Sequence, residues 1–424
     1  MFKICLKRYN REMKFQYLVI LALTAAALAQ NPPPAKSVTV PVTLDHNRVV
    51  IDVDLTLPDG TTQRIRGWVD NGNPDLYLSR RVATLLGLNV TCGEKECSSP
   101  PPREIAIGGL KISLNTIKVA KIPLRPPTAA AVAFAGMNAE INIPSTLLRN
   151  YDVLINFPGH EFTLAPPGTL KFNGSKTKVL VNSENGLVQI PSQIERKKYN
   201  LALDVGASIS LLDPELFDNL AAAHPAWPHM TGAVGPANMW GFDSEPQWKL
   251  MRIDRIQYGP LFLTNLPVVE FTKDWMAFFE KRAGIPTAGL IGADVLANYR
   301  VGLDYAHFTV YFDIGRLFNF PEFDVIGLIL RPEDDYRFTI LGVADYDGKP
   351  SVPVVQPGDQ LLAVDGIAVP GITLGQVWLM LGGEPGKERR LIIGRDGKQI
   401  NFAATVQHFL GEAPGEDTSN KKKR

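Results

Sequence analysis

Two similar acidic loops, one in each half of the chain, constrain its fold more than any other sequence feature. The first contains Asp70-Asn71-Gly72 and the second Asp204-Val205-Gly206, and each lies between two short apolar runs. This pattern predicts a carboxylate on a tight turn between two buried strands, held rigidly and partly removed from water. A single motif of this kind more often marks an ordinary strand end. Its significance depends on whether the chain around it is repeated as well.

The strands that lead into the two loops are repeated. Residues Val49 to Leu57 alternate between apolar and polar, which predicts a half-buried strand. The turn at Asp59-Gly60 leads to a second strand, Thr62 to Val69, which delivers Asp70. A hairpin within residues 186–203 delivers Asp204 in the same way. Further strands are expected at 105–112 and at 116–122.

A short helix is expected after each loop. Ser79 is a suitable N-cap for a helix from Arg80 to Leu86. In the second half, Asp213 followed by Pro214 predicts the start of a helix that covers Glu215 to Ala222.

The two halves also end in similar segments. Residues 143–157 align without a gap with residues 291–305, and both segments indicate a turn, a short helix and a strand. Three pairs of matching segments in one order indicate an internal duplication of two β-rich lobes.

Composition supports a β protein and excludes other classes. The chain has 424 residues, 45% hydrophobic residues and a net charge of +1, so no basic surface argues for nucleic-acid binding. Its 36 Gly and 33 Pro residues suit a loop-rich β fold. Three Cys and six scattered His residues provide no metal-binding pattern, so no metal and no cofactor are expected.

The first 29 residues resemble a signal peptide. A basic stretch precedes an apolar run from Tyr17 to Leu28, which is short for a membrane span, and Ala27-Leu28-Ala29 fits a cleavage site. Met13 also opens a compact signal by itself. The expected location is therefore secreted or periplasmic, and the alternative is an uncleaved anchor.

The two loops, the helix after each and the segment that ends in Leu290-Ile291-Gly292 together resemble the aspartic peptidases, specifically the bacterial retropepsin-like ones. The resemblance covers residues 37–313, and it implies a lobe at 37–167 and a second lobe at 178–313. It also implies that Asp70 and Asp204 meet between the lobes as a catalytic dyad, so that a monomer is complete. The supporting loop residues would be Asn71, Gly72, Val205, Gly206, Ala207 and Ser208.

Three positions depart from this family pattern. Thr or Ser normally follows each acid and locks the loops together, but this chain has Asn71 and Val205, and Val205 has no hydroxyl. Pro144 occupies the place of a family glycine. Two functions therefore stay open: an aspartic-type endopeptidase that acts on peptides or unfolded proteins, and an inactive relative that binds peptides or proteins.

Cys92 and Cys97 form a close pair after the first loop. Export makes a disulfide between them reasonable, and the pair resembles a small disulfide of pepsin-like enzymes. Two free thiols are the alternative.

The C-terminal part is similar to a bacterial PDZ domain over residues 320–408. The similarity is carried by Gln356 to Gly366, and a helix is expected at Leu374 to Leu381. By resemblance, the loop formed by Ile326, Gly327, Leu328 and Ile329 would bind the carboxylate of a peptide, and the partner of the domain would be a protein C-terminus or an internal peptide. The alternative is a structural domain with a blocked groove. Residues 411–424 are expected to form a disordered charged tail.

Overall fold

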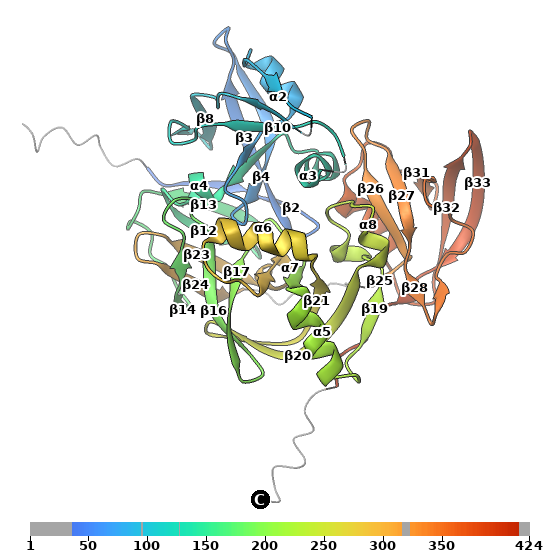
Figure 1. Ribbon diagram of the computed structural model, residues 1–424. Helices are drawn as coiled ribbons and strands as arrows, with labels where there is room; N and C mark the ends of the chain where they lie inside the picture. Colours follow the sequence, from blue (N-terminus) through green and yellow to red (C-terminus); the bar gives the residue numbers. More distant parts are fainter. Residues whose placement is uncertain (1–35, 95, 127, 316–322, 415–424) are drawn as a thin grey trace, which may run out of the picture. The chain divides into compact units, whose positions relative to one another are not determined.

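The computed structural model describes residues 36–94, 96–126, 128–315 and 323–414, and the described residues from Val38 onward belong to one compact unit. The chain is mainly β and has two β-rich lobes, which confirms the predicted fold class (Figure 1). The predicted signal segment 1–29, the first residues of the predicted PDZ domain (320–322) and residues 415–424 lie outside the described residues.

The first lobe is built on a sheet whose strand β4 ends at the first acidic loop. In spatial order this sheet contains β11 (Ile141–Pro144), β4 (Thr62–Asp70), β3 (Arg48–Thr56), β8 (Glu104–Ile107) and β9 (Leu110–Ser113), and β2 (Thr43–Asp45) pairs with β3. A smaller sheet contains β5 (Leu76–Tyr77), β10 (Ala120–Pro123), β7 (Glu96–Ser99) and β6 (Thr91–Cys92). The helices of this lobe are α2 (Arg80–Leu85), α3 (Ala129–Met137) and α4 (Ser145–Leu148).

The second lobe contains one eight-stranded sheet, and its strand β17 leads into the second acidic loop. In spatial order the strands are β15 (Leu180–Val181), β16 (Val188–Ile194), β17 (Lys197–Leu203), β22 (Gly289–Ile291), β18 (Ser210–Leu212), β21 (Leu261–Glu270), β20 (Lys249–Tyr258) and β19 (His229–Thr231). The helical segments are α5 (Pro214–Ala223), η1 (Gly235–Ala237), η2 (Glu245–Gln247), α6 (Lys273–Ala283) and α7 (Ala293–Leu296).

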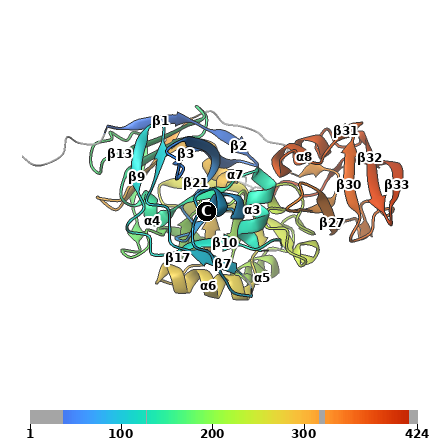
Figure 2. The same ribbon diagram turned by 90° about the horizontal axis from the view of Figure 1, so that it is seen from above.

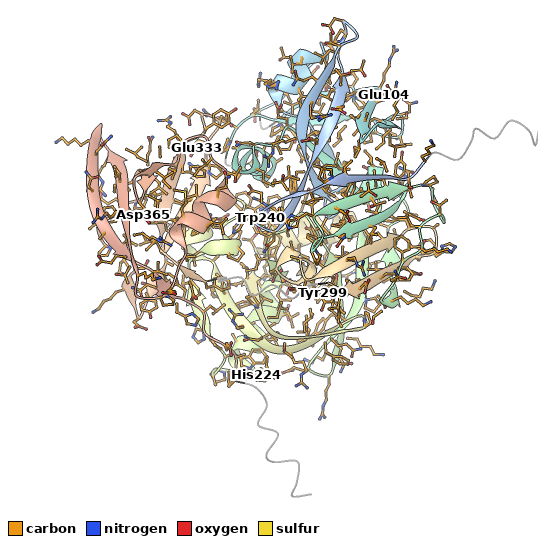
Figure 3. The ribbon with its side chains drawn as sticks, turned by 180° about the vertical axis from the view of Figure 1, so that it is seen from behind. Glu104, His224, Trp240, Tyr299, Glu333 and Asp365 are labelled. Carbon is orange, nitrogen blue, oxygen red and sulfur yellow. A yellow bond between two sulfur atoms is a disulfide. The ribbon has the colours of Figure 1, made fainter. Side chains whose placement is uncertain are left out.

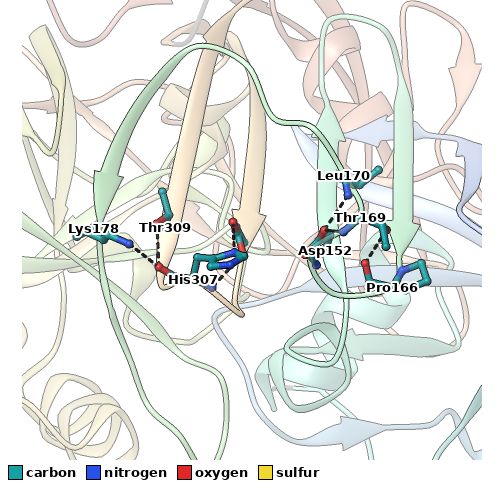
Figure 4. Close-up of polar contacts among 9 residues, drawn as sticks. Asp152, Pro166, Thr169, Leu170, Lys178, His307 and Thr309 are labelled. Atoms are coloured by element: carbon teal, nitrogen blue, oxygen red, sulfur yellow. Dashed lines mark hydrogen bonds and ion pairs between the residues drawn. The ribbon is translucent and has the colours of Figure 1, made fainter. Parts of the chain in front are cut away.

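A six-stranded sheet joins the two lobes. Its order is β1 (Val38–Pro41), β13 (Glu161–Ala165), β12 (Asp152–Asn156), β23 (Tyr299–Asp304), β24 (Thr309–Ile314) and β14 (Ser175–Lys178). Asp152 pairs in register with Asp304 where the halves meet. The Asp152 carboxylate accepts hydrogen bonds from the backbone of 168–170, and Asp304 accepts one from the His307 backbone (Figure 4). Both carboxylates thus hold turns at this sheet.

The repeated segments occupy equivalent places in the two lobes. In the first lobe β11 runs parallel to β4, with Pro144 opposite Asp70. In the second lobe β22 runs parallel to β17, with Ile291 opposite Leu203. Each acidic loop therefore starts beside a parallel strand from its own closing segment.

The C-terminal part contains a sheet, a helix and two small strand pairs. The sheet order is β26 (Leu328–Pro332), β27 (Phe338–Val343), β30 (Gln360–Val364), β32 (Glu388–Arg395) and β33 (Lys398–Thr405), and β31 (Ile367–Ala368) pairs with β30. The strand pairs are β25 (Asp324–Val325) with β34 (Gln407–His408) and β28 (Asp345–Tyr346) with β29 (Lys349–Pro350). Helix α8 covers Leu374–Leu381 and begins with a capping box. Its residues share a core cluster with Met239, Trp248 and Phe271 of the second lobe.

Three expectations need correction. Residues 105–112 form a hairpin, β8–β9, because Gly108 and Gly109 both adopt a positive φ and turn the chain. The strand expected at 116–122 is only β10, Ala120–Pro123. The tail does not become disordered at Gly411, because Arg252 donates a hydrogen bond to the Gly411 carbonyl and the amide of Ala413 donates to Asn265.

Candidate active site

The two acidic loops face each other. If Gly72 carried a Cβ atom, that atom would lie 2.2 Å from Cγ of Asp204. A Cβ atom on Gly206 would lie 2.4 Å from Oδ1 of Asp70 and 3.1 Å from Oδ1 of Asp204. Each carboxylate therefore packs on the glycine of the opposite loop, and both loops need glycine because a side chain would occupy the place of a carboxylate.

Asn71 locks the loops together from one side. Its Nδ2 donates a hydrogen bond of 2.8 Å to the carbonyl oxygen of Leu203, and its Oδ1 accepts one of 2.8 Å from the Val205 amide. Asn71 is fully buried, so both bonds form away from water. The side chain of Val205 is also fully buried, but it has no polar atom that could form a hydrogen bond with the backbone of the first loop.

The second loop is supported from beneath by its own closing segment. The Ile291 carbonyl accepts a hydrogen bond from the Asp204 amide, and Ala207 accepts one from the Ala293 amide. Gly292 lies so close to this loop that an added Cβ would be 2.5 Å from the Ile209 carbonyl oxygen. This contact explains why glycine follows the apolar pair Leu290-Ile291.

Burial makes ionisation of both acids costly. Asp70 is 3% exposed and Asp204 is 9% exposed. Burial, and then the negative charge of Asp204, raise the pKa of Asp70 well above its ordinary value, against the opposing effects of Asn73 and Arg282. Burial raises the pKa of Asp204 to about 6, although the backbone of Gly206 and other loop amides favour its ionised form. Because both pKa values are raised and the two acids titrate as a pair, they share one proton more readily than two ordinary carboxyl groups.

The chain is similar to an aspartic proteinase. The aspartic proteinase from Irpex lacteus matches 66% of this chain and 97% of its own chain, at 11% sequence identity and a TM-score of 0.39. No protein-family model matches the chain, and no curated protein matches its sequence.

Arg48 is a charged residue near the dyad that the sequence analysis does not identify. Arg48 is 1% exposed, and burial lowers its pKa while the negative charges of Asp45 and Asp70 oppose that effect. Among the described residues its Nε and Nη2 atoms have no hydrogen-bond partner. Arg48 opens β3, the strand that pairs with β4, and this pairing brings a cation to the acid at the end of β4.

Met239 is a second missed residue. Its sulfur accepts hydrogen bonds from the Ser208 amide at 3.0 Å and from the Ser208 hydroxyl at 2.9 Å. Ser208 belongs to the Asp204 loop, so this contact fixes the loop from the side of the segment after η1.

The predicted carboxylate-binding loop of the C-terminal part is closed. Ile326, Gly327, Leu328 and Ile329 are all buried. The Ile326 amide donates to the Leu381 carbonyl, and the Leu328 amide donates to Ile326. Neither of these two amides is therefore available to a peptide carboxylate in this conformation.

Cys92 and Cys97 are joined in a disulfide between β6 and β7. Among the described residues, no group of three or more His, Cys, Asp and Glu side chains could hold a metal ion. The described part of the chain also contains no helix that is long and apolar enough to span a membrane.

Proposed function

We propose that this chain is an aspartic-type endopeptidase in which Asp70 and Asp204 act on peptides or unfolded proteins. The observation that carries the proposal is the packing of each carboxylate on the glycine of the opposite loop, at Gly72 and Gly206. Two acids that face each other at such close range can share one proton and one water molecule.

The chemistry follows from the shared proton. The ionised acid takes a proton from a water molecule between the two carboxyl groups, and the resulting hydroxide adds to the carbonyl carbon of the scissile bond. The protonated acid gives its proton to the carbonyl oxygen, which produces a neutral tetrahedral intermediate. The carbon–nitrogen bond then breaks as the nitrogen receives a proton from the protonated acid, while one hydroxyl of the intermediate returns its proton to the other carboxylate and becomes the carbonyl oxygen of the new carboxyl group. One ionised and one protonated acid are thereby restored.

The proposal extends to location and partners. The signal-like segment 1–29 supports a secreted or periplasmic protein, and the Cys92–Cys97 disulfide fits an oxidising compartment. The C-terminal part is proposed to be a PDZ-type module that binds an extended peptide along the edge of β26.

A second function is favoured by one specific observation. Val205 leaves the loop lock one-sided, and such a dyad would hold its water less rigidly than a two-sided one. The corresponding alternative is a peptide- or protein-binding module that keeps the fold without the chemistry.

The deciding experiment is peptide cleavage by the purified chain without residues 1–29, followed by mass spectrometry from acid to neutral pH. Cleavage is expected in the wild type and should be lost in Asp70→Asn and in Asp204→Asn. Asp213→Asn is a matched control, because Asp213 caps helix α5 and Asn is an equally good N-cap. A well-folded wild type that cleaves no peptide would favour the binding module.

A further inference from the structure

The edge of the C-terminal sheet is occupied by the chain itself. Strand β26 is the end strand of its sheet. The Leu330 amide donates a hydrogen bond of 2.9 Å to Oδ1 of Asn238, and Nδ2 of Asn238 donates one of 2.8 Å to the Leu330 carbonyl. A residue of an added antiparallel strand makes the same exchange of one N–H and one carbonyl bond. The Asn238 carboxamide thus occupies the place that the backbone of an added strand would take.

Helix α3 fills the space beside this edge. A Cβ atom on Gly136 would lie 3.3 Å from Cγ of Pro332 in β26 and 3.4 Å from Cβ of Leu374 in α8. The helix is apolar almost all round, and most of its residues are buried. Figures 1 and 2 both show α3 beside the C-terminal part. Strand β26 and helix α8 therefore hold a helix from the first lobe where a peptide would lie.

The segment that carries Asn238 is rigid. We name residues 235–245 the strap. Buried Glu245 accepts hydrogen bonds from the backbone amides of Trp240 and Phe242 and from Nδ2 of Asn238. Nδ2 therefore uses both of its hydrogen atoms, one on Glu245 and one on Leu330, which fixes the orientation of the carboxamide. Trp240, labelled in Figure 3, packs against the ring of Trp248.

The strap also holds the Asp204 loop. Met239 follows Asn238 directly, and its sulfur binds the amide and hydroxyl of Ser208. Consecutive Cα atoms are about 3.8 Å apart, so Asn238 cannot leave Leu330 by a large distance without moving Met239. Two neighbouring side chains thus connect the edge of β26 to the loop that contains Asp204.

We propose that the strap is an internal ligand of β26, and that an extended peptide segment of another protein displaces both Asn238 and helix α3 from this edge and thereby releases Met239 from Ser208. The incoming strand would form several backbone pairs in place of the single pair made by Asn238. The partner shifts the chain toward an open state because it binds only when the edge is free. The physical link does not depend on catalysis, but its role as a switch for peptide cleavage rests on the proposed function.

Amide hydrogen exchange of the chain from residue 30 onward tests the link. In Asn238→Ala, exchange at Leu330 should accelerate about tenfold or more, because its amide loses its acceptor. Exchange at Ser208 should accelerate in the same variant. Met239→Leu keeps the volume but loses the sulfur, so exchange at the Ser208 amide should accelerate. Because the coupling is reciprocal, exchange at the Leu330 amide should accelerate as well. Asn200→Ala, which removes a carboxamide outside the strap, should change neither amide.

Two outcomes would overturn the link. The first is faster exchange of the Leu330 amide in Asn238→Ala with no change in the exchange rate of the Ser208 amide. The second is an unchanged exchange rate of the Ser208 amide in Met239→Leu. Exchange within β3 and β4 reports whether a variant is folded. If the Asn238→Ala variant does not fold, a double variant with Gly136→Cys and Leu374→Cys is used in its place. The two Cβ atoms would be 3.4 Å apart, so the cysteines can form a disulfide that links α3 to α8. Oxidation of that pair should slow exchange at both Leu330 and Ser208, and an effect on Leu330 alone would contradict the proposal.

The partner class is tested with an octapeptide of alternating Val and Thr, which has a high strand propensity. Asn238→Ala should bind it about tenfold more tightly than the wild type, since two hydrogen bonds no longer compete. Equal affinity for the two chains, or binding to neither, would overturn the assignment. Peptide cleavage is measured on the same preparations. If exchange at Leu330 and Ser208 is coupled but no peptide is cleaved, only the proposed function is refuted. If peptides are cleaved but the exchange is not coupled, only the proposed role of the strap is refuted.

Discussion

Asn71 and Val205 are joined across the interface of the two lobes by a hydrogen bond of 2.8 Å from the Val205 amide to Oδ1 of Asn71. The same carboxamide donates to the Leu203 carbonyl. A single side chain thus provides two hydrogen bonds that tie the first loop to the second.

Replacement of Asn71 by Ala should destabilise the chain. It would leave the Leu203 carbonyl and the Val205 amide buried without partners, at a cost of about 2–4 kcal/mol in the free energy of unfolding. Asn71→Thr should lose less, because a hydroxyl both donates and accepts. Urea unfolding measures both variants. Equal losses would show that the hydrogen bonds do not stabilise the lock.

Val205→Thr should complete the lock. By the symmetry of the two loops, a hydroxyl at this position would face the backbone of the first loop as Asn71 faces the second. We expect a neutral or stabilising change in the free energy of unfolding. Val301→Thr is the matched control, because Val301 is equally buried within β23 and its hydroxyl should cost about 1–3 kcal/mol. A similar loss of unfolding free energy in both variants would mean that the hydroxyl at position 205 finds no hydrogen-bond partner.

The loops and their pairing were accessible to sequence reasoning because the signals are local and occur twice. Asp70 and Asp204 both follow short apolar runs in a duplicated chain, and the resemblance to aspartic peptidases implies that they meet. The helix α5 could be predicted for the same reason, since Asp213 and Pro214 mark its start. Duplication therefore converts two weak motifs into one structural prediction.

The helix α6 was missed although its signals are present. Thr272 caps its start, Lys281 and Arg282 lie in its last turn, and Gly284 follows with φ of 73°. Helix α3 carries weaker signals, because it is apolar on almost every side and its N-cap Thr128 makes no side-chain cap hydrogen bond.

The contacts of Arg48 and Asn238 had no local signal at all. Arg48 reaches Asp70 only through strand pairing, and Asn238 binds Leu330, which lies 92 residues further along the chain. Tertiary contacts of single polar residues at such separations leave no periodicity in the sequence. They become visible only when the fold brings the elements together.

Gly72→Ala should be severely disruptive. The new Cβ would lie 2.2 Å from Cγ of Asp204, so the carboxylate or the loop must move. We expect a loss of about 3 kcal/mol or more in the free energy of unfolding. Gly93→Ala is the control, since its Cβ would meet only the Glu96 carbonyl oxygen at 3.5 Å. Thermal unfolding of the two variants compares them, and a mild effect at Gly72 would contradict the close approach of the loops.

Arg48→Met should make the dyad harder to ionise. The cation near Asp70 favours the charged acid, so its removal should raise the pKa of the pair. Carbon-13 NMR titration of the Asp carboxyl groups measures this shift. Arg48→Lys keeps the charge and should shift the pKa less. An unchanged titration in Arg48→Met would show that Arg48 does not influence the dyad.

Asp204→Asn should stabilise the chain, and the gain should grow with pH. The pKa of Asp204 is raised from 3.8 to about 6, so folding disfavours its ionised form. Below the unfolded pKa both states are protonated and the substitution removes no ionisation cost. As pH rises from about 4 to about 6, the unfolded acid ionises while the folded one resists, so the wild type loses stability across this window, on the order of 3 kcal/mol in all, and the loss is constant above it. Asn carries no charge and avoids this loss, and relief of the repulsion on Asp70 acts in the same direction. Denaturant unfolding of both chains from acid to neutral pH measures the difference, and a gain that is constant or falls with pH would contradict the buried dyad.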